Sequence, residues 1–112
     1  MFNWFRFRLG GRSGSWGKVR KKFLRNNPIC AVCGTKKKLE AHHCIPYNVD
    51  KFKELSLDNL IVLCRPCHYM FGHCFLSWQS YNEDIKMDAK IVNSIIINSQ
   101  EQWKKTQQKT TD

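Results

Sequence analysis

Acidic residues are missing from the first third of this 112-residue chain, in which the earliest one is Glu40. The stretch from Met1 to Lys38 holds eleven lysines and arginines and no aspartate or glutamate. Over the whole chain, 19 basic residues stand against 9 acidic ones, a formal net charge of +10. A charge run is often only a solvated face, but a complete absence of acids over this length favours contact with a polyanion.

Long apolar runs are missing too. No segment approaches 18 consecutive apolar residues, which excludes an ordinary transmembrane helix and predicts no membrane partner. Residues 1–9 mix aromatic residues with arginines and lack the apolar centre of a secretory signal. We therefore expect a reducing, cytoplasmic compartment, in which six cysteines bind metal more readily than they form disulfides.

A basic amphipathic helix is expected over residues 15–26, ending before Pro28. Its apolar residues fall on one arc, which Arg20 interrupts, and its other basic residues fall on the opposite side. An ordinary packing helix would show the same split, so the basic side only adds a DNA-contact hypothesis. The apolar residues are Trp16, Val19, Phe23 and Leu24, and the basic ones are Lys18, Lys21, Lys22 and Arg25.

Two strands and two further helices are expected downstream. The pattern predicts short strands over 38–41 and 60–63, joined by a long loop over 44–58. A helix should follow from Arg65 to about Gln79, with Pro66 in its first turn. A last helix is expected over 84–105, with its periodic apolar residues used for packing.

Four of the six cysteines form two Cys-x-x-Cys pairs thirty residues apart, namely Cys30 with Cys33 and Cys64 with Cys67. Zinc takes four soft ligands in a tetrahedron, and each pair supplies two thiolates from one tight turn. The alternative of two disulfides conflicts with a reducing compartment. We predict a structural Zn²⁺ site with all four positions filled by protein. Cys44 and Cys74 lack partners at ligand spacing and are expected to be small, buried or half-buried residues.

All four histidines lie within 32 residues: His42, His43, His68 and His73. Three separated strings surround them, in the order Leu-Glu-Ala-His-His-Cys-Ile-Pro (39–46), Leu-Asp-Asn-Leu-Ile (57–61) and Leu-Cys-Arg-Pro-Cys-His (63–68). Together they closely resemble the HNH endonuclease family. The upstream segment, with Asn27-Pro28 and Cys-Ala-Val-Cys-Gly at 30–34, is similar to the one that precedes this motif in many small bacterial and phage HNH nucleases. The resemblance covers roughly residues 13–82.

This resemblance implies an α+β fold: a small ββα-metal (His-Me finger) nuclease core with a structural four-cysteine zinc site and flanking N- and C-terminal helices. We accordingly expect a basic flexible arm at 1–14, an HNH nuclease domain at 15–82, and a C-terminal helix and tail at 83–112. The expected location is the cytoplasm of a bacterial cell or a phage-infected host.

The resemblance also assigns roles by position in the motif. His43 would be the general base, His42 and His68 would bind the catalytic cation, and Asn59 would orient the loop that carries the base. Adjacent side chains of a strand point to opposite faces, so one histidine can face a cation while its neighbour faces the attacking water. A neutral imidazole near pH 7 is well suited to accept a proton. The cation would be Mg²⁺, Mn²⁺, Ni²⁺ or Zn²⁺.

The role of His73 stays open at this point. It lies five residues after His68, which places the two about 140° apart on a regular helix. Gly72 could permit a wide turn that brings His73 round to the cation. A structural histidine that caps or packs in the helix is the equal alternative.

The predicted function is metal-dependent hydrolysis of phosphodiester bonds in DNA, by nicking or double-strand cleavage. Backbone phosphates would be held by a set of basic residues that carry little sequence information. Alternatives are a non-catalytic zinc-binding DNA module, and a subunit of a phage packaging or restriction machine with its own protein partners; an RNA substrate also stays open. The phosphate-binding set is Arg12, Lys18, Lys21, Lys22, Arg25, Lys36, Lys37 and Arg65.

Overall fold

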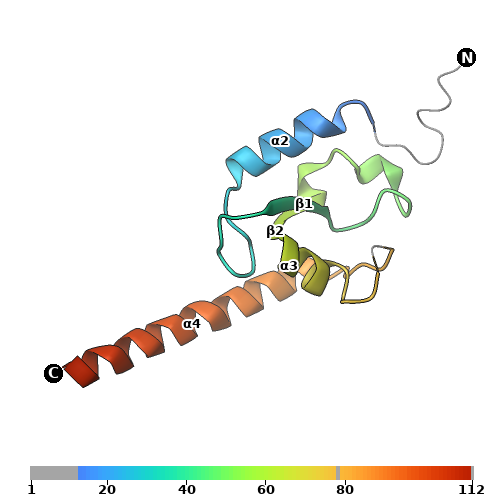
Figure 1. Ribbon diagram of the computed structural model, residues 1–112. Coiled ribbons are helices and arrows are strands. Elements are labelled where there is room, and N and C mark those ends of the chain that lie inside the picture. Colours follow the sequence, from blue (N-terminus) through green and yellow to red (C-terminus); the bar gives the residue numbers. More distant parts are fainter. Residues whose placement is uncertain (1–12, 78, 112) are drawn as a thin grey trace, which may run out of the picture.

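The computed structural model describes residues 13–77 and 79–111 (Figure 1). Most of the expected arm, with Arg12, lies outside the described residues. Two strands, a long N-terminal helix, a short helical segment and a long C-terminal helix make up the fold. In chain order the elements are α2 (Trp16–Asn26), β1 (Leu39–His43), η2 (Lys51–Lys53), η3 (Leu57–Asn59), β2 (Leu60–Cys64), α3 (Arg65–Cys67), η4 (His68–Gly72) and α4 (Ile85–Thr111).

The two strands pair antiparallel and bring the histidine pair to the start of β2. In this register Leu39 lies opposite Cys64, and His43 lies opposite Leu60. All five residues of β2 are buried, whereas β1 is half-buried until it reaches its two histidines. Both strands were predicted from the sequence, and the α+β fold with two strands and flanking helices is confirmed.

The hydrophobic core is small, and much of it consists of cysteines and their neighbours. Leu63, Ile85, Val32 and Cys30 are its most completely buried side chains. The amide of Asn93 on α4 donates to the Val32 carbonyl at 2.9 Å, which ties α4 to the first cysteine turn. So few buried apolar groups give limited hydrophobic stabilisation, which a structural metal site can supplement.

The helix expected from Arg65 to Gln79 is wrong in its length and in its type. Helical structure ends at Gly72, and its second half, η4, is a π-helical turn. The backbone N–H of His73 donates to the carbonyl of His68 at 3.1 Å, five residues back. Cys74 and Phe75 then adopt left-handed φ values of 58° and 62°, which end the helix. Cys74 is exposed in this loop, contrary to the burial expected of it.

The C-terminal helix is longer than expected and packs over only part of its length. Figure 1 shows α4 running away from the strand pair. Ile85 and Ala89 are buried, but Ile91, Ile95 and Trp103 are each more than half exposed. Packing was expected of the periodic set Ile85, Ala89, Val92, Ile96 and Trp103. The first four are buried or packed against the core, and for Trp103 the expectation is wrong. The helix extends beyond the small core, so its outer turns have no core to meet.

The N-terminal helix agrees closely with the sequence pattern. Its apolar side is half-buried, and Lys18, Lys21, Lys22 and Arg25 are exposed. Arg20, which interrupts the apolar arc, is half-buried with it. Among the described residues, no helix is both long and apolar enough to cross a membrane.

Candidate functional site

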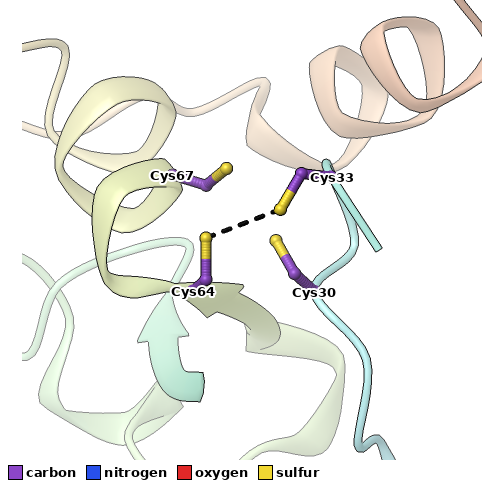
Figure 2. A group of neighbouring side chains, drawn as sticks. All are labelled: Cys30, Cys33, Cys64 and Cys67. Carbon is purple, nitrogen blue, oxygen red and sulfur yellow. Dashed lines mark hydrogen bonds between the residues drawn. The ribbon is translucent and has the colours of Figure 1, made fainter. Parts of the chain in front are cut away.

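Four cysteine side chains converge where the first cysteine turn meets the end of β2. Figure 2 shows Cys30 and Cys33 facing Cys64 and Cys67, with the four sulfur atoms pointing toward a common centre. The ligand atoms all lie within 4.8 Å of one another, and the Sγ atoms of Cys33 and Cys64 are 3.6 Å apart. Four thiolates around one zinc ion at about 2.3 Å would be about 3.8 Å apart. The cluster therefore fits a structural zinc site, and no cysteine of the chain is in a disulfide.

The thiols of this cluster have unlike proton affinities. Burial raises the pKa of Cys64 and Cys67, and nearby thiols add to the effect at Cys67. At Cys30 burial acts in the same direction, but backbone hydrogen bonds from Cys33, Cys64 and Val32 outweigh it and lower the pKa to about 7. A divalent cation would offset the negative charge that four ionised thiols bring together.

A second cluster is formed by three of the four histidines. His42, His68 and His73 each offer a ring nitrogen within 4.8 Å of the others. The π-helical turn makes this possible, because its five-residue hydrogen bond places His73 beside His68. The wide turn that the sequence left open at Gly72 is therefore present.

Two of these histidines have tautomers that their hydrogen bonds determine. The Nδ1 of His68 lies 2.8 Å from a carboxylate oxygen of Glu40, and the Nδ1 of His73 lies 2.6 Å from the carbonyl of Ser80. Both partners are acceptors, so both Nδ1 atoms carry the proton and both neutral rings keep a lone pair on Nε2. The two Nε2 atoms lie 3.2 Å apart. Two lone pairs facing each other at this distance repel unless a metal ion or a proton lies between them.

His42 supplies the third nitrogen from a buried position. The residue is only 3% exposed, and its Nε2 has no hydrogen-bond partner among the described residues. Burial, reinforced by the neighbouring His68 and His73, lowers its pKa to about 3. The imidazole is therefore neutral at physiological pH. A buried, unpartnered imidazole nitrogen beside two other lone pairs fits a metal ion.

Gly72 makes room for His42. A Cβ atom added at Gly72 would lie 3.0 to 3.2 Å from three atoms of the His42 ring. A side chain there would require the ring or the turn to shift by a few tenths of an ångström. Gly72 therefore contributes both to the wide turn and to the space that His42 occupies.

His43 points away from this cluster, as alternation along a strand requires. Its Nε2 lies 2.9 Å from the backbone carbonyl of Glu54, and the Trp16 ring lies over its ring with the centroids 4.4 Å apart. Because a carbonyl only accepts, Nε2 carries the proton and Nδ1 is the basic nitrogen of the neutral ring.

Asn59 holds the long loop between the strands. Its Oδ1 accepts from the amide of Ile45, and its Nδ2 donates to the carbonyls of Ile45 and Lys53. The buried side chain thus joins the two ends of this loop. Its contacts are those of a residue that orients the loop.

One cleft of about 660 Å³ brings the two kinds of histidine together. The three-histidine cluster and His43 both open into it, beside two arginines and a carboxylate. Its lining consists of Trp16, Arg20, Glu40, Ala41, His42, His43, Pro46, Tyr47, Asn48, Arg65, His68 and His73.

Comparison with known families agrees with this geometry. The HNH endonuclease family model matches residues 30–73, from the first cysteine of the zinc cluster to the last histidine of the cleft. This segment is an HNH domain. Its family implies DNA as the substrate. Segments 13–29 and 74–82, which the resemblance also covered, lie outside the match. No curated protein and no solved structure matches the chain.

Four polar residues that line the HNH cleft were not predicted, namely Arg20, Glu40, Tyr47 and Asn48. Glu40 bridges the Nδ1 of His68 and the guanidinium of Arg65, at 2.8 and 2.9 Å. It lies two residues before His42 on β1 and therefore on the same strand face, which is a signal that the sequence contained. Arg20 reaches the cleft from α2, and its place within an apolar arc was the corresponding signal.

The predicted phosphate-binding residues are only partly gathered at the HNH domain. Arg65 lines the cleft, where it is paired with Glu40. Lys36 and Lys37 are exposed in the loop before β1, and the four basic residues of α2 are exposed on that helix. These six residues are not among those that line the cleft.

Proposed function

We propose that this protein is a metal-dependent HNH endonuclease that hydrolyses phosphodiester bonds in DNA. The observation that carries the proposal is the pairing of two features in one cleft. Three imidazole nitrogens converge on a common point, and a fourth imidazole, His43, is held with its basic nitrogen on Nδ1. A module that only binds DNA needs neither feature.

His42, His68 and His73 would hold the catalytic cation. When bound, the cation neutralises charge on the scissile phosphate and on the leaving oxygen. Glu40 and the Ser80 carbonyl fix the tautomers of His68 and His73, as partners behind metal-binding histidines commonly do. Three imidazoles suit Zn²⁺, Ni²⁺ or another transition metal, whereas Mg²⁺ prefers oxygen ligands. Of the cations expected from the sequence, we therefore favour the transition metals over Mg²⁺.

His43 would act as the general base. Its Nδ1 would accept a proton from the attacking water, while the Nε2–H stays protonated and donates a hydrogen bond to the Glu54 carbonyl. Asn59 would act as a positioning residue, because it joins the loop ends between which Glu54 lies. Arg20 and Arg65, at the cleft wall, would hold phosphate groups next to the bond that is cleaved.

The DNA backbone would extend from the cleft onto α2. Lys18, Lys21, Lys22 and Arg25 are exposed there, and Lys36 and Lys37 are exposed in the following loop. Such contacts supply affinity that depends on salt and not on base sequence. Within this proposal, residues 15–82 act as the nuclease unit, Arg12 and the arm add phosphate contacts, and the site of action is the cytoplasm of a bacterial or phage-infected cell.

The test is cleavage of supercoiled plasmid by the full chain with Zn²⁺, Ni²⁺, Mn²⁺ or Mg²⁺, with and without EDTA. The expected result is conversion to nicked or linear DNA with a transition metal, abolished by EDTA and by His43→Ala. If the zinc-loaded parent binds DNA but cuts it with none of these metals, the non-catalytic zinc-binding DNA module replaces the nuclease.

A further inference from the structure

The loop between the strands contains a buried acid whose carboxylate the proposed chemistry does not use. Glu54 is only 4% exposed. Both of its carboxylate oxygens accept from the backbone N–H of Ser13, at 3.2 and 3.0 Å. Ser13 is 41 residues away in the chain, at the start of the segment that leads into α2. A carboxylate is rarely buried without a specific partner, so we expect the contact between Glu54 and Ser13 to serve the structure or the site.

The same residue holds His43 with its backbone. The carbonyl of Glu54 accepts from Nε2 of His43, which decides the tautomer of the ring. The Glu54 amide is itself tied to the Lys51 carbonyl at 3.4 Å, a long bond that fixes the turn only weakly. The neighbouring Lys53 carbonyl accepts from Nδ2 of Asn59 at 3.1 Å, so Asn59 and the side-chain contact with Ser13 both anchor this turn.

The contacts of Glu54 close into a ring. Its carboxylate binds Ser13, and the carbonyl of Ser13 accepts from the backbone N–H of Trp16 at 3.1 Å. The indole of Trp16 lies over the ring of His43, whose Nε2 returns to the Glu54 carbonyl. The Trp16 indole thus contacts the face of the His43 ring, and the Glu54 carbonyl contacts its edge. Glu54 links these two groups.

We propose that Glu54 is a positioning residue for His43, acting through its carboxylate on Ser13 and its carbonyl on Nε2. The role rests on the proposed nuclease function for its effect on rate, but its effect on the ring can be measured without cleavage. The ring of contacts also connects the base to the start of α2, and so to the helix whose basic side would carry DNA. A displaced Glu54 leaves the imidazole free to turn or to change tautomer, while the three-histidine cluster keeps its own supports from Glu40 and Ser80.

The experiment uses the full zinc-loaded chain and compares Glu54→Ala with Glu54→Gln. Loss of the side chain should slow plasmid cleavage roughly 10²-fold under single-turnover conditions, since a small misplacement of a reacting group has about this effect. Plasmid affinity and metal content should stay at the parent's values. Glutamine keeps an oxygen that can accept from Ser13, so it should recover most of the rate. If Glu54 served only folding, the cleavage rate, the plasmid affinity and the metal content would fall together.

A second pair of variants removes the donor instead of the acceptor. Ser13→Pro deletes the backbone N–H and should reproduce the loss seen with Glu54→Ala. Ser13→Ala keeps that N–H and loses only the exposed contact of the Ser13 hydroxyl with the Ser15 N–H, so it should keep most of the parent's rate. This pair carries the test if Glu54→Ala does not fold. Equal cleavage by Ser13→Pro and Ser13→Ala would overturn the proposal, as would full activity of Glu54→Ala.

The tautomer of His43 gives a readout that needs no cleavage. Nitrogen-15 spectra of labelled histidine in the parent should show His43 with the proton on Nε2. In Glu54→Ala and Ser13→Pro that signal should shift toward mixed tautomers, with the signals of His68 and His73 unchanged. An unchanged His43 signal in both variants would refute the positioning role. If the parent cuts no DNA with any metal, the proposed function fails, and the spectra still decide the role of Glu54.

Discussion

The cysteine cluster and the histidine cluster share one short stretch of chain, since Cys67 directly precedes His68. They differ in how far each is closed to solvent. The four thiols point at one another from inside the core, and three of them are buried. The three imidazoles line a cleft with two arginines and His43. Four ligands with no room for another suit a structural ion, and three ligands beside an opening suit a catalytic one.

The two clusters thus differ both in ligand type and in how open each is to solvent, and the openness is what distinguishes a catalytic ion from a structural one. The helix that follows β2 supplies ligands to both clusters, so a structural ion at the cysteines would also hold the frame for the histidines. Loss of the first cluster should therefore disable the second, while loss of the second should leave the first intact. The following changes test that asymmetry, beginning with the largest expected effect.

Cys67→Ser should abolish cooperative folding. A structural zinc site in so small a domain supplies much of the folding free energy, and one missing thiolate removes it. Thermal unfolding followed by circular dichroism, together with zinc analysis, measures this. The matched control is Cys74→Ser, which changes an exposed thiol outside the cluster and should shift stability by less than about 0.5 kcal/mol. A folded, zinc-free Cys67→Ser would contradict the structural role.

His43→Ala should slow DNA cleavage by roughly 10²–10⁴-fold, the usual contribution of a positioned general base. Zinc content, metal affinity of the cleft and plasmid binding should remain, because His43 lies outside both clusters. His42→Ala should also lose cleavage, but added metal should partly restore it. If metal restores His43→Ala and leaves His42→Ala inactive, the assignment of the adjacent pair must be reversed.

Glu40→Gln should weaken binding of the transition metal to the cleft by about 10–100-fold, the usual effect of removing a carboxylate behind a metal-binding histidine. The amide oxygen can still accept from His68, but without the negative charge that strengthens the ligand. Titration with Co²⁺ or Ni²⁺ followed by absorbance measures the affinity. Retention of the cysteine-bound zinc is the control, and an unchanged titration would mean that Glu40 serves only Arg65.

Gly72→Ala should weaken the same metal affinity by roughly tenfold, within the range for groups that orient ligands. The added Cβ would lie 3.0 Å from the His42 ring, so the ring or the turn must shift by a few tenths of an ångström, which should disturb the cluster. The control is Gly17→Ala, where an added Cβ meets nothing within 4 Å. It should leave metal binding as it is and stabilise α2 slightly. Equal metal affinity in the two variants would show that the close approach to His42 is unimportant.

Lys18→Gln with Lys21→Gln should have the smallest effect, on the salt dependence of DNA binding. The slope of log affinity against log salt should fall by about 0.9 for each phosphate contact that is lost. Fluorescence anisotropy with a random duplex at several salt concentrations measures it. Lys90→Gln, on the exposed part of α4, is the matched control. The same slope for both proteins would move the DNA-binding surface away from α2.

The sequence by itself determined both strands, the basic side of α2 and the pairing of the four cysteines. These follow from local rules, namely alternation along a strand, periodicity along a helix and the short reach of a Cys-x-x-Cys turn. It did not determine where the helix after β2 ends. That depends on a π-helical hydrogen bond from His73 to His68, and on the fit of the His42 ring against Gly72.

Only the tertiary structure brought Glu40 to His68 and Glu54 to Ser13. Those partners lie 28 and 41 residues apart, and no periodic pattern links residues at such distances. The tautomers of His43, His68 and His73 were decided in the same way, because each depends on an acceptor that folding places beside one ring nitrogen. A local pattern can name the groups that carry the chemistry, but the proton on each ring is set by neighbours that meet only when the chain folds.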